Sequence, residues 1–222
     1  NEDLSFMRNE RWLDAIEASL IAQALRAQHG TPAVAAEFDI PLSDHELVDV
    51  YIDYFTGRGR KHFAKWLARA ERYRPMMEPI LAEHGLPLDT FYLAMIESGL
   101  RSKAYSVAAA SGFWQFIRST GQLFGMRMDH WVDERRDFVT ATHAACRYLK
   151  RLHRQFGHWH LAWASYNAGE GRIGRALRRT GVGTYWELVD RNAIPKETRH
   201  YVPKIIAAAM IAKNAESYGF TN

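Results

Sequence analysis

Residues 93–99 read Leu-Ala-Met-Ile-Glu-Ser-Gly, an apolar run with one carboxylate at its end. After Glu97 the next acidic residue is Asp129, and the 31 residues between them contain no Asp or Glu. If the apolar neighbours bury Glu97, desolvation raises the pKa of its carboxyl and keeps it partly protonated near neutral pH, as a general acid requires. Chemistry that runs on one carboxyl group includes cleavage of a glycosidic bond. Taken alone, Glu97 is better explained as a surface residue at a helix end, because perturbed carboxylates are rare.

Helical periodicity extends in both directions from this run, and alternating strand-like runs are nearly absent, which predicts an all-α protein. A helix is expected to begin at Ser43, because Ser43 and Glu46 have capping-box spacing. A later helix, which carries Phe63 and Ala70, should break or kink at the Arg74-Pro75 step. The other predicted helices cover residues 4–28, 89–97, 112–124, 136–156, 161–166 and 196–218.

A domain boundary is predicted at Gly85-Leu86-Pro87. Residues 1–85 would form an N-terminal helical extension, packed on a catalytic unit formed by residues 86–222. Residues 101–111 are rich in Ser and Ala, and we expect them to form a loop that crosses the site region. No repeat of fixed period is evident.

The composition is that of a globular protein, with 47% hydrophobic and 24% charged residues, which excludes a disordered chain. There are 29 Lys and Arg against 25 Asp and Glu, and the basic residues gather in two clusters along predicted helical faces. No zinc-finger spacing, basic zipper or RNA-binding sheet motif accompanies them, so no nucleic-acid partner is expected. The two clusters are Arg147, Lys150, Arg151 and Arg154, and Arg172, Arg175, Arg178 and Arg179.

The sequence contains no motif for a metal-binding site or for a catalytic cysteine. Cys146 is the single cysteine and lies in an apolar helical pattern, so it is interpreted as a packing residue and not as a nucleophile. The 10 histidines include His143 and His153 but no His-Glu-x-x-His motif. The sequence therefore predicts no metal site and no cofactor.

No apolar stretch approaches the length of a transmembrane helix, and no signal peptide is visible. The chain begins at Asn1 and not at Met, which indicates a mature or trimmed fragment. We therefore expect that a signal peptide, a membrane anchor or further domains can belong outside these residues.

Three further segments accompany Ile96-Glu97-Ser98-Gly99, and together they resemble the lytic transglycosylases of the soluble lytic transglycosylase superfamily. The resemblance covers most of residues 46–212 and extends to the membrane-bound lytic murein transglycosylase D branch. The three segments are Ser106 with Gly112-Phe113-Trp114-Gln115-Phe116, then Ala164-Ser165-Tyr166-Asn167-Ala168-Gly169, then Glu197-Thr198-Arg199-His200-Tyr201-Val202-Pro203. The branch is indicated by Tyr51-Ile52-Asp53-Tyr54-Phe55, Trp66-Leu67, Gly85-Leu86-Pro87 and Trp131-Val132-Asp133-Glu134-Arg135-Arg136-Asp137.

The resemblance implies a lysozyme-like, goose-type catalytic domain that cleaves the β-1,4 bond between N-acetylmuramic acid and N-acetylglucosamine in peptidoglycan. Glu97 matches the family's single catalytic acid. It would protonate the leaving glycosidic oxygen and then, as carboxylate, take the proton from the C6 hydroxyl that attacks the anomeric carbon. The product is a 1,6-anhydro ring, and a second carboxylate becomes unnecessary because an intramolecular hydroxyl replaces water.

Five more residues match family positions in the substrate cleft. Ser106 and Gln115 would hydrogen-bond the catalytic carboxyl group or the substrate. Tyr166 and Asn167 match the motif in which the tyrosine hydroxyl lies near the catalytic Glu and the substrate N-acetyl group. Tyr201 matches another aromatic residue of the cleft, although a tyrosine of the core would look the same in sequence.

The implied partners are peptidoglycan glycan strands in the bacterial cell envelope, acted on in the periplasm without a cofactor. An outer-membrane anchor and glycan-binding modules could belong to a longer protein, and we expect a monomer. Several positions depart from the common family pattern, namely Leu100, Arg101, Ser102, Ala109 and Arg118. Ala109 stands where glycine is frequent, and a Cβ disfavours positive φ angles.

Two alternatives stay open. A muramidase of the same fold would let water attack and would leave a reducing end in place of the anhydro ring. A glycan-binding module would hold the strand without cutting it, and Glu97→Gln would then change no product.

Overall fold

The computed structural model describes residues 37–220, so the helix predicted at residues 4–28 lies outside it. Within that range the backbone is helical, and its only β pairing consists of isolated bridges. The prediction of an all-α protein is therefore confirmed. The helices are α3 (Glu46–Thr56), α4 (Arg60–Glu83), α5 (Phe91–Ser98), α6 (Arg118–Leu123), α7 (Phe138–Phe156), α8 (Trp159–Ala168), α9 (Glu170–Thr180), α10 (Tyr185–Asp190), α11 (Lys196–Arg199) and α12 (Tyr201–Lys213), with 3-10 turns η3 (Leu88–Thr90) and η4 (Glu134–Arg136).

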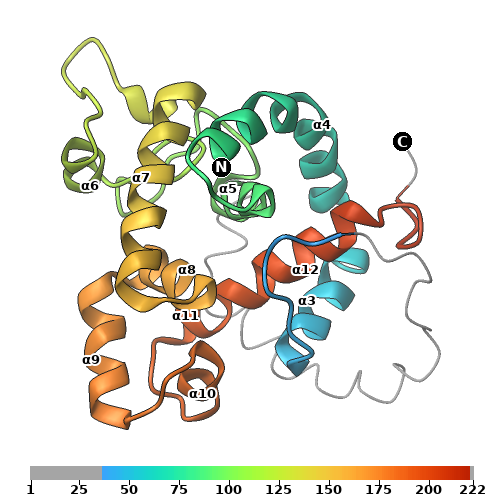
Figure 1. Cartoon of the computed structure of the whole chain (residues 1–222). Helices are drawn as coiled ribbons and strands as arrows, with labels where there is room; N and C mark the ends of the chain where they lie inside the picture. The colour runs from blue at the N-terminus through green and yellow to red at the C-terminus, as the bar shows by residue number, and fades with distance from the viewer. Residues whose placement is uncertain (1–36, 221–222) are drawn as a thin grey trace.

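Helix α12 lies at the centre of the fold. Its sequence is apolar apart from Lys204 and the terminal Lys213, which is typical of a helix surrounded by other helices, and residues 201–209 are all buried. It packs against α3, α5 and α8, and Figure 1 shows α3 on one side of it and α5 on the other. Tyr201, its first residue, is thereby held against the end of α5.

Residues on both sides of the predicted domain boundary share one hydrophobic core. On the N-terminal side, the ring centroids of Phe55 in α3 and Phe63 in α4 lie 4.8 Å apart, and those of Phe63 and Trp66 lie 5.8 Å apart. The boundary residues Gly85 to Pro87 form the turn between α4 and η3. The division of the chain into an extension and a catalytic domain stays a prediction.

The predicted start of a helix at Ser43 was wrong, because α3 begins at Glu46. The side chain of His45 caps it by accepting a hydrogen bond from the backbone N–H of Leu47. Ser43 instead accepts from the backbone N–H of His45. Stacking of His45 on Trp186, with ring centroids 4.6 Å apart, holds the imidazole in this capping position.

A break or a kink was predicted at the Arg74-Pro75 step, and no break occurs, because α4 continues through Pro75 and Pro79 to Glu83. The prolines remove backbone hydrogen bonds, yet buried residues such as Trp66 and Leu81 anchor the helix on both sides of them. Figure 1 shows α4 changing direction along its length, as the loss of these bonds predicts.

The predicted helix at residues 112–124 was wrong over its first half, since only α6 is helical there. Gly112 and Gln115 have φ angles of +80° and +49°, which an α-helix does not allow, and isolated bridges join Ser111 to Tyr105 and to Phe116. The helix predicted at residues 196–218 is two helices that meet at His200 and end at Lys213, and α9 and α10 were not predicted. The helices predicted at residues 89–97, 136–156 and 161–166 are confirmed within a few residues, as is the loop at residues 101–111.

Candidate active site

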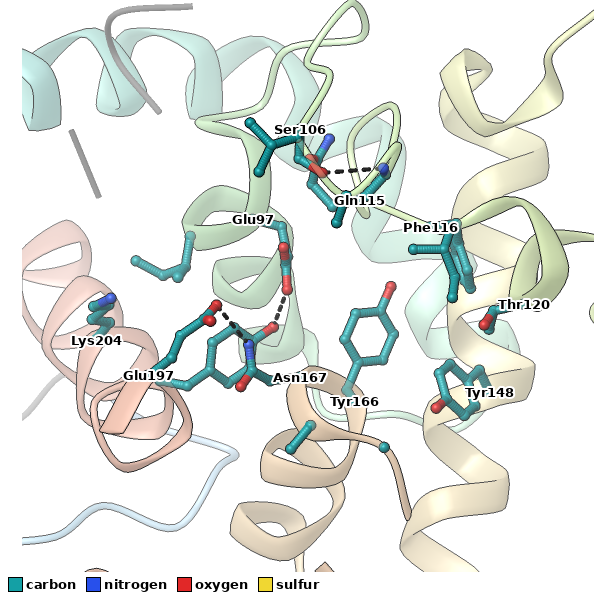
Figure 2. A pocket seen from close by; sticks show the side chains of 18 residues that line it. Glu97, Ser106, Gln115, Phe116, Thr120, Tyr148, Tyr166, Asn167, Glu197 and Lys204 are labelled. Carbon is teal, nitrogen blue, oxygen red and sulfur yellow. Dashed lines mark hydrogen bonds between the residues drawn. The ribbon is translucent and has the colours of Figure 1, made fainter. Parts of the chain in front are cut away.

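A cleft of about 550 Å³ lies between α5, α8, the start of α12 and the loop of residues 104–117. All six candidate residues line it, although they come from four separate parts of the chain. They are Glu97, Ser106, Gln115, Tyr166, Asn167 and Tyr201. Figure 2 shows Glu97 facing the interior of the cleft, with Tyr166 and Asn167 from α8 on the opposite wall.

Glu97 lies in the last turn of α5 and is partly buried between fully packed neighbours. Its Oε1 accepts a hydrogen bond of 2.5 Å from the hydroxyl of Tyr201. The helix ends directly after it, because Gly99 adopts φ +58° and a Cβ there would lie 2.4 Å from the indole nitrogen of Trp66. The position of this carboxylate is thus fixed by the packed end of α5 and by the hydrogen bond from Tyr201. The expectation that burial raises its pKa stays a prediction.

Two tyrosines of the cleft, Tyr166 and Tyr201, are held in their protonated form. Burial, followed by the charge of the nearby Glu97, raises the pKa of Tyr166 and of Tyr201 well above the usual value. Tyr201 therefore remains a hydrogen-bond donor to Glu97 at neutral pH. The Tyr166 hydroxyl donates to the backbone carbonyl of Trp114 at 2.7 Å, which fixes its ring beside the loop.

These raised pKa values predict a loss of stability in alkali. Unfolded tyrosines ionise near pH 10, while the buried ones keep their protons, so above pH 10 the unfolded state binds fewer protons. The free energy of unfolding should then fall by up to about 1.4 kcal/mol per pH unit for each fully buried tyrosine, and should be flat between pH 8 and 9. Urea unfolding between pH 8 and 11.5 checks this, and a flat profile to pH 11.5 would contradict it. The tyrosines with raised pKa values are Tyr92, Tyr148, Tyr166, Tyr185, Tyr201 and Tyr218.

Ser106 and Gln115 shape the loop that forms one wall of the cleft. The side-chain nitrogen of Gln115 donates to the carbonyl oxygens of Ala104 at 3.2 Å and Gly112 at 2.8 Å. The Ser106 hydroxyl oxygen accepts from the backbone N–H of Ala110 at 3.1 Å. Both side chains thus hold the backbone in place, and their predicted contact with substrate stays a prediction.

Arg135 clamps this loop from behind and was not singled out from the sequence. Its Nη1 donates to the carbonyl oxygens of Ala109 at 2.8 Å and Phe116 at 3.0 Å, and its other nitrogens bind the carboxylate of Asp133. That hydrogen bonding lowers the pKa of Asp133, which stays charged as the partner of a buried arginine. Ala109 has φ +59°, so the chain adopts here the backbone conformation for which the family's glycine is suited.

Asn167 is held by two side chains of α11. Its Nδ2 donates to Glu197 Oε1 at 3.3 Å, and its Oδ1 accepts from the Thr198 hydroxyl at 2.8 Å. Glu197 lines the cleft as a second carboxylate, and Figure 2 shows it on the same side as Asn167. Sequence reasoning did not select Glu197, because an exposed glutamate at the start of a helix is ordinary.

Lys204 also lines the cleft and was missed. It lies one turn after Tyr201 on α12, is only 4% exposed, and has its Nζ 5.4 Å from the ring centre of Tyr51. The lysine alone does not indicate a site residue, because lysines are common in helices. Its place within a run of apolar residues could have indicated a buried charge.

The far end of the cleft is aromatic. The ring of Tyr166 lies 5.2 Å from that of Tyr148 and 5.9 Å from that of Phe116, and all three residues line the cleft. The hydroxyl of Tyr148 donates to Glu170 at 3.2 Å, so the ring is fixed at its polar end. Such a surface suits the apolar face of a sugar ring.

Cys146 takes no part in the cleft. It is fully buried in α7, and burial raises the pKa of its thiol to about 12. The prediction that it is a packing residue is confirmed, since a thiol with that pKa is a poor nucleophile at neutral pH.

Comparison with known proteins gives a consistent result. A family model described as the transglycosylase SLT domain matches residues 82–189. The membrane-bound lytic murein transglycosylases D of Escherichia coli strain K12 and of strain O6:H1 are each 36% identical over 167 residues, which is 73% of this chain and 36% of the relative. The lytic transglycosylase Slt of Pseudomonas aeruginosa, solved as an inactive mutant, matches with a TM-score of 0.54 and 23% identity over 67% of this chain and 25% of that one. This likeness confirms the predicted lysozyme-like fold.

The chain spans about a third of the length of the curated relatives that it matches. Across residues 37–220, none of the helices has the combination of length and apolar character that crossing a membrane requires.

Proposed function

This chain belongs to the family of lytic transglycosylases with an SLT domain, and from that premise we propose that it cleaves the β-1,4 bond between N-acetylmuramic acid and N-acetylglucosamine in peptidoglycan. The cleavage is non-hydrolytic and leaves a 1,6-anhydro ring on the muramic acid. The observation that carries the proposal is the carboxyl group of Glu97, which faces a sugar-sized cleft and is held at 2.5 Å by the Tyr201 hydroxyl.

Glu97 serves as acid and then as base. Its proton passes to the glycosidic oxygen, which leaves with the N-acetylglucosamine. The C6 hydroxyl of the muramic acid attacks the anomeric carbon and gives its proton to the Glu97 carboxylate, so the enzyme returns to its starting state. Because the nucleophile belongs to the substrate, proximity replaces activation of a water molecule.

Tyr201 is the residue that orients Glu97. Tyr201→Phe keeps the ring but removes the hydrogen bond to Oε1, so we expect kcat to fall about tenfold with KM nearly unchanged. Initial rates of anhydro-product release at several peptidoglycan concentrations measure both constants. Tyr92→Phe is the matched control, because Tyr92 is also buried but lies outside the cleft. An equal effect of the two substitutions would mean that Tyr201 acts only through packing.

One observation favours hydrolysis as a second candidate function. Glu197 is a second carboxylate in the cleft, and a muramidase would use such a group to activate water. Glu197→Gln discriminates the two reactions. The transglycosylase keeps its anhydro products in this variant, because its chemistry runs through Glu97, whereas a muramidase that depends on Glu197 loses its products.

Borohydride reduction of the products tests the proposed reaction. Muropeptides released from purified peptidoglycan are treated with borohydride, which reduces a free muramic acid end but leaves a 1,6-anhydro end unchanged. We expect products that resist reduction. Products that are fully reduced would identify a muramidase.

The remaining properties follow from the substrate. Peptidoglycan strands are the partner, and the place of action is the periplasmic side of the bacterial cell envelope. The E. coli relatives are named as membrane-bound, and an anchor or glycan-binding modules in a longer protein would bring this domain to its substrate. The domain acts as a monomer without a cofactor.

A further inference from the structure

A pair of histidines joins two helices away from the cleft. His84 follows the last residue of α4, and His143 lies in the second turn of α7, which packs against α4. The Nε2 of His84 and the Nδ1 of His143 are 2.8 Å apart, and the ring planes meet at 64°. One of these nitrogens carries a proton and the other presents its lone pair. Two ring nitrogens, one at the end of α4 and one on α7, thus face each other.

A carboxylate completes the cluster. An oxygen of Glu83 and the two ring nitrogens all lie within 4.8 Å of one another. Zinc binds imidazole nitrogen at about 2.0–2.1 Å, so two nitrogens at a tetrahedral zinc ion stand roughly 3.4 Å apart. The observed 2.8 Å separation therefore has to open by less than 1 Å for an ion to enter between the rings.

We propose that Glu83, His84 and His143 bind a Zn²⁺ ion, with water as the fourth ligand. Two imidazoles and one carboxylate are a ligand set that zinc accepts. On binding, the imidazole that donates in this hydrogen bond moves its proton to its other ring nitrogen, so both facing nitrogens present lone pairs to the ion and no net proton is released. His84 at the end of α4 and His143 in the second turn of α7 are both half-buried, while the exposed Glu83 leaves an entry path for the ion.

Two cations oppose the ion and set its affinity. Lys150 donates to the carbonyl oxygen of His84 at 2.9 Å, and Arg147 donates to that of Phe124 at 2.6 Å, so both are tied to nearby backbone. Their charges act on His84 and lower the attraction for Zn²⁺. The site is accordingly expected to bind in the micromolar range and not as tightly as a structural zinc finger.

The ion would act on stability and not on catalysis. His143 and the cleft residue Tyr148 are five residues apart on α7, which places them about 140° apart around the helix. The ion would instead clamp the end of α4 to α7, just before the chain enters α5 and reaches Glu97. Binding to the folded state alone raises its stability, by roughly 5 °C in the midpoint of thermal unfolding at a hundredfold excess over Kd.

Calorimetric titration with ZnCl₂ tests the site, on tag-free protein freed of metal with a chelator. We expect one equivalent bound to the wild type, and binding weakened at least about tenfold in His143→Ala and in Glu83→Gln. Glu83→Gln alters an exposed side chain and leaves the packing of α4 intact. His130→Ala, which removes an exposed histidine outside the cluster, should bind as the wild type does.

Cobalt gives an independent readout, because Co²⁺ in a tetrahedral site absorbs visible light much more strongly than it does in water. The visible bands should appear with the wild type and be lost in both cluster variants. Absence of Zn²⁺ binding by the wild type, or equal binding by the wild type, His143→Ala and Glu83→Gln, would overturn the proposal. Neither result bears on the peptidoglycan reaction, which is measured separately.

Discussion

Glu97→Gln is expected to reduce the release of muropeptides from purified peptidoglycan about a thousandfold or more. The amide has nearly the size of the carboxyl group, and its oxygen can still accept the hydrogen bond from Tyr201. It cannot give a proton to the leaving oxygen or take one from the attacking hydroxyl. Chromatography of the soluble products after timed digestion measures the loss.

A matched variant separates this effect from a general effect of lost charge. Glu216→Gln removes an exposed carboxylate that does not line the cleft, and it should keep the wild-type rate. If Glu97→Gln stays within tenfold of the wild type, Glu97 is not the acid. If the wild type and Glu97→Gln both bind glycan strands and neither cuts them, the chain is a binding module.

Gly112→Ala should be the most damaging substitution for the fold of the site. Gly112 has φ +80°, and a Cβ there would lie 1.7 Å from the backbone carbonyl oxygen of Arg135. Backbone cannot rotate away as a side chain can, so the loop and η4 must separate and the Arg135 clamp must open. We expect the free energy of unfolding to fall by about 4 kcal/mol, from the strained backbone and the overpacking together. Urea unfolding measures this loss.

The control for Gly112→Ala is Gly181→Ala. Gly181 has a similar φ of +69°, but a Cβ at this position would meet no atom within 4 Å beyond its immediate chain neighbours. Gly181→Ala should lower the free energy of unfolding by only about 1 kcal/mol, because alanine adopts a positive φ less readily than glycine does. Equal losses at the two positions would show that the close approach to Arg135 is relieved at little cost.

The elements that could be predicted from the sequence are those with long apolar patterns. Helices α7 and α12 lie within the predicted ranges 136–156 and 196–218, because buried positions recur at helical spacing in α7 and fill residues 201–209 of α12. The prediction of a break or a kink at Arg74-Pro75 left open whether α4 would end there, and packing on both sides of the prolines keeps the helix continuous. Residues 112–117 were assigned to a helix because the sequence does not display the contact of Gly112 with Arg135.

Six of the residues that line the candidate site could be predicted from the sequence, but the contacts among them could not. Glu97 was marked by its isolation among apolar residues, and the other five by the resemblance to a family. The hydrogen bond between Glu97 and Tyr201 joins residues 104 positions apart, so only the path of the chain brings them together. For the same reason the place of Glu197 in the cleft was missed, and the pairing of His84 with His143, 59 positions apart, could not be seen.

The central claim is that the bond is broken without water, and digestion in water enriched in oxygen-18 tests it most directly. Mass spectrometry of the released muropeptides shows whether the heavy oxygen has entered the muramic acid end. The account predicts products lighter by one water than reducing-end muropeptides and free of the heavy isotope. Products that carry one heavy oxygen per new end would contradict it, and would make Glu197 the first carboxylate to test as the group that activates water.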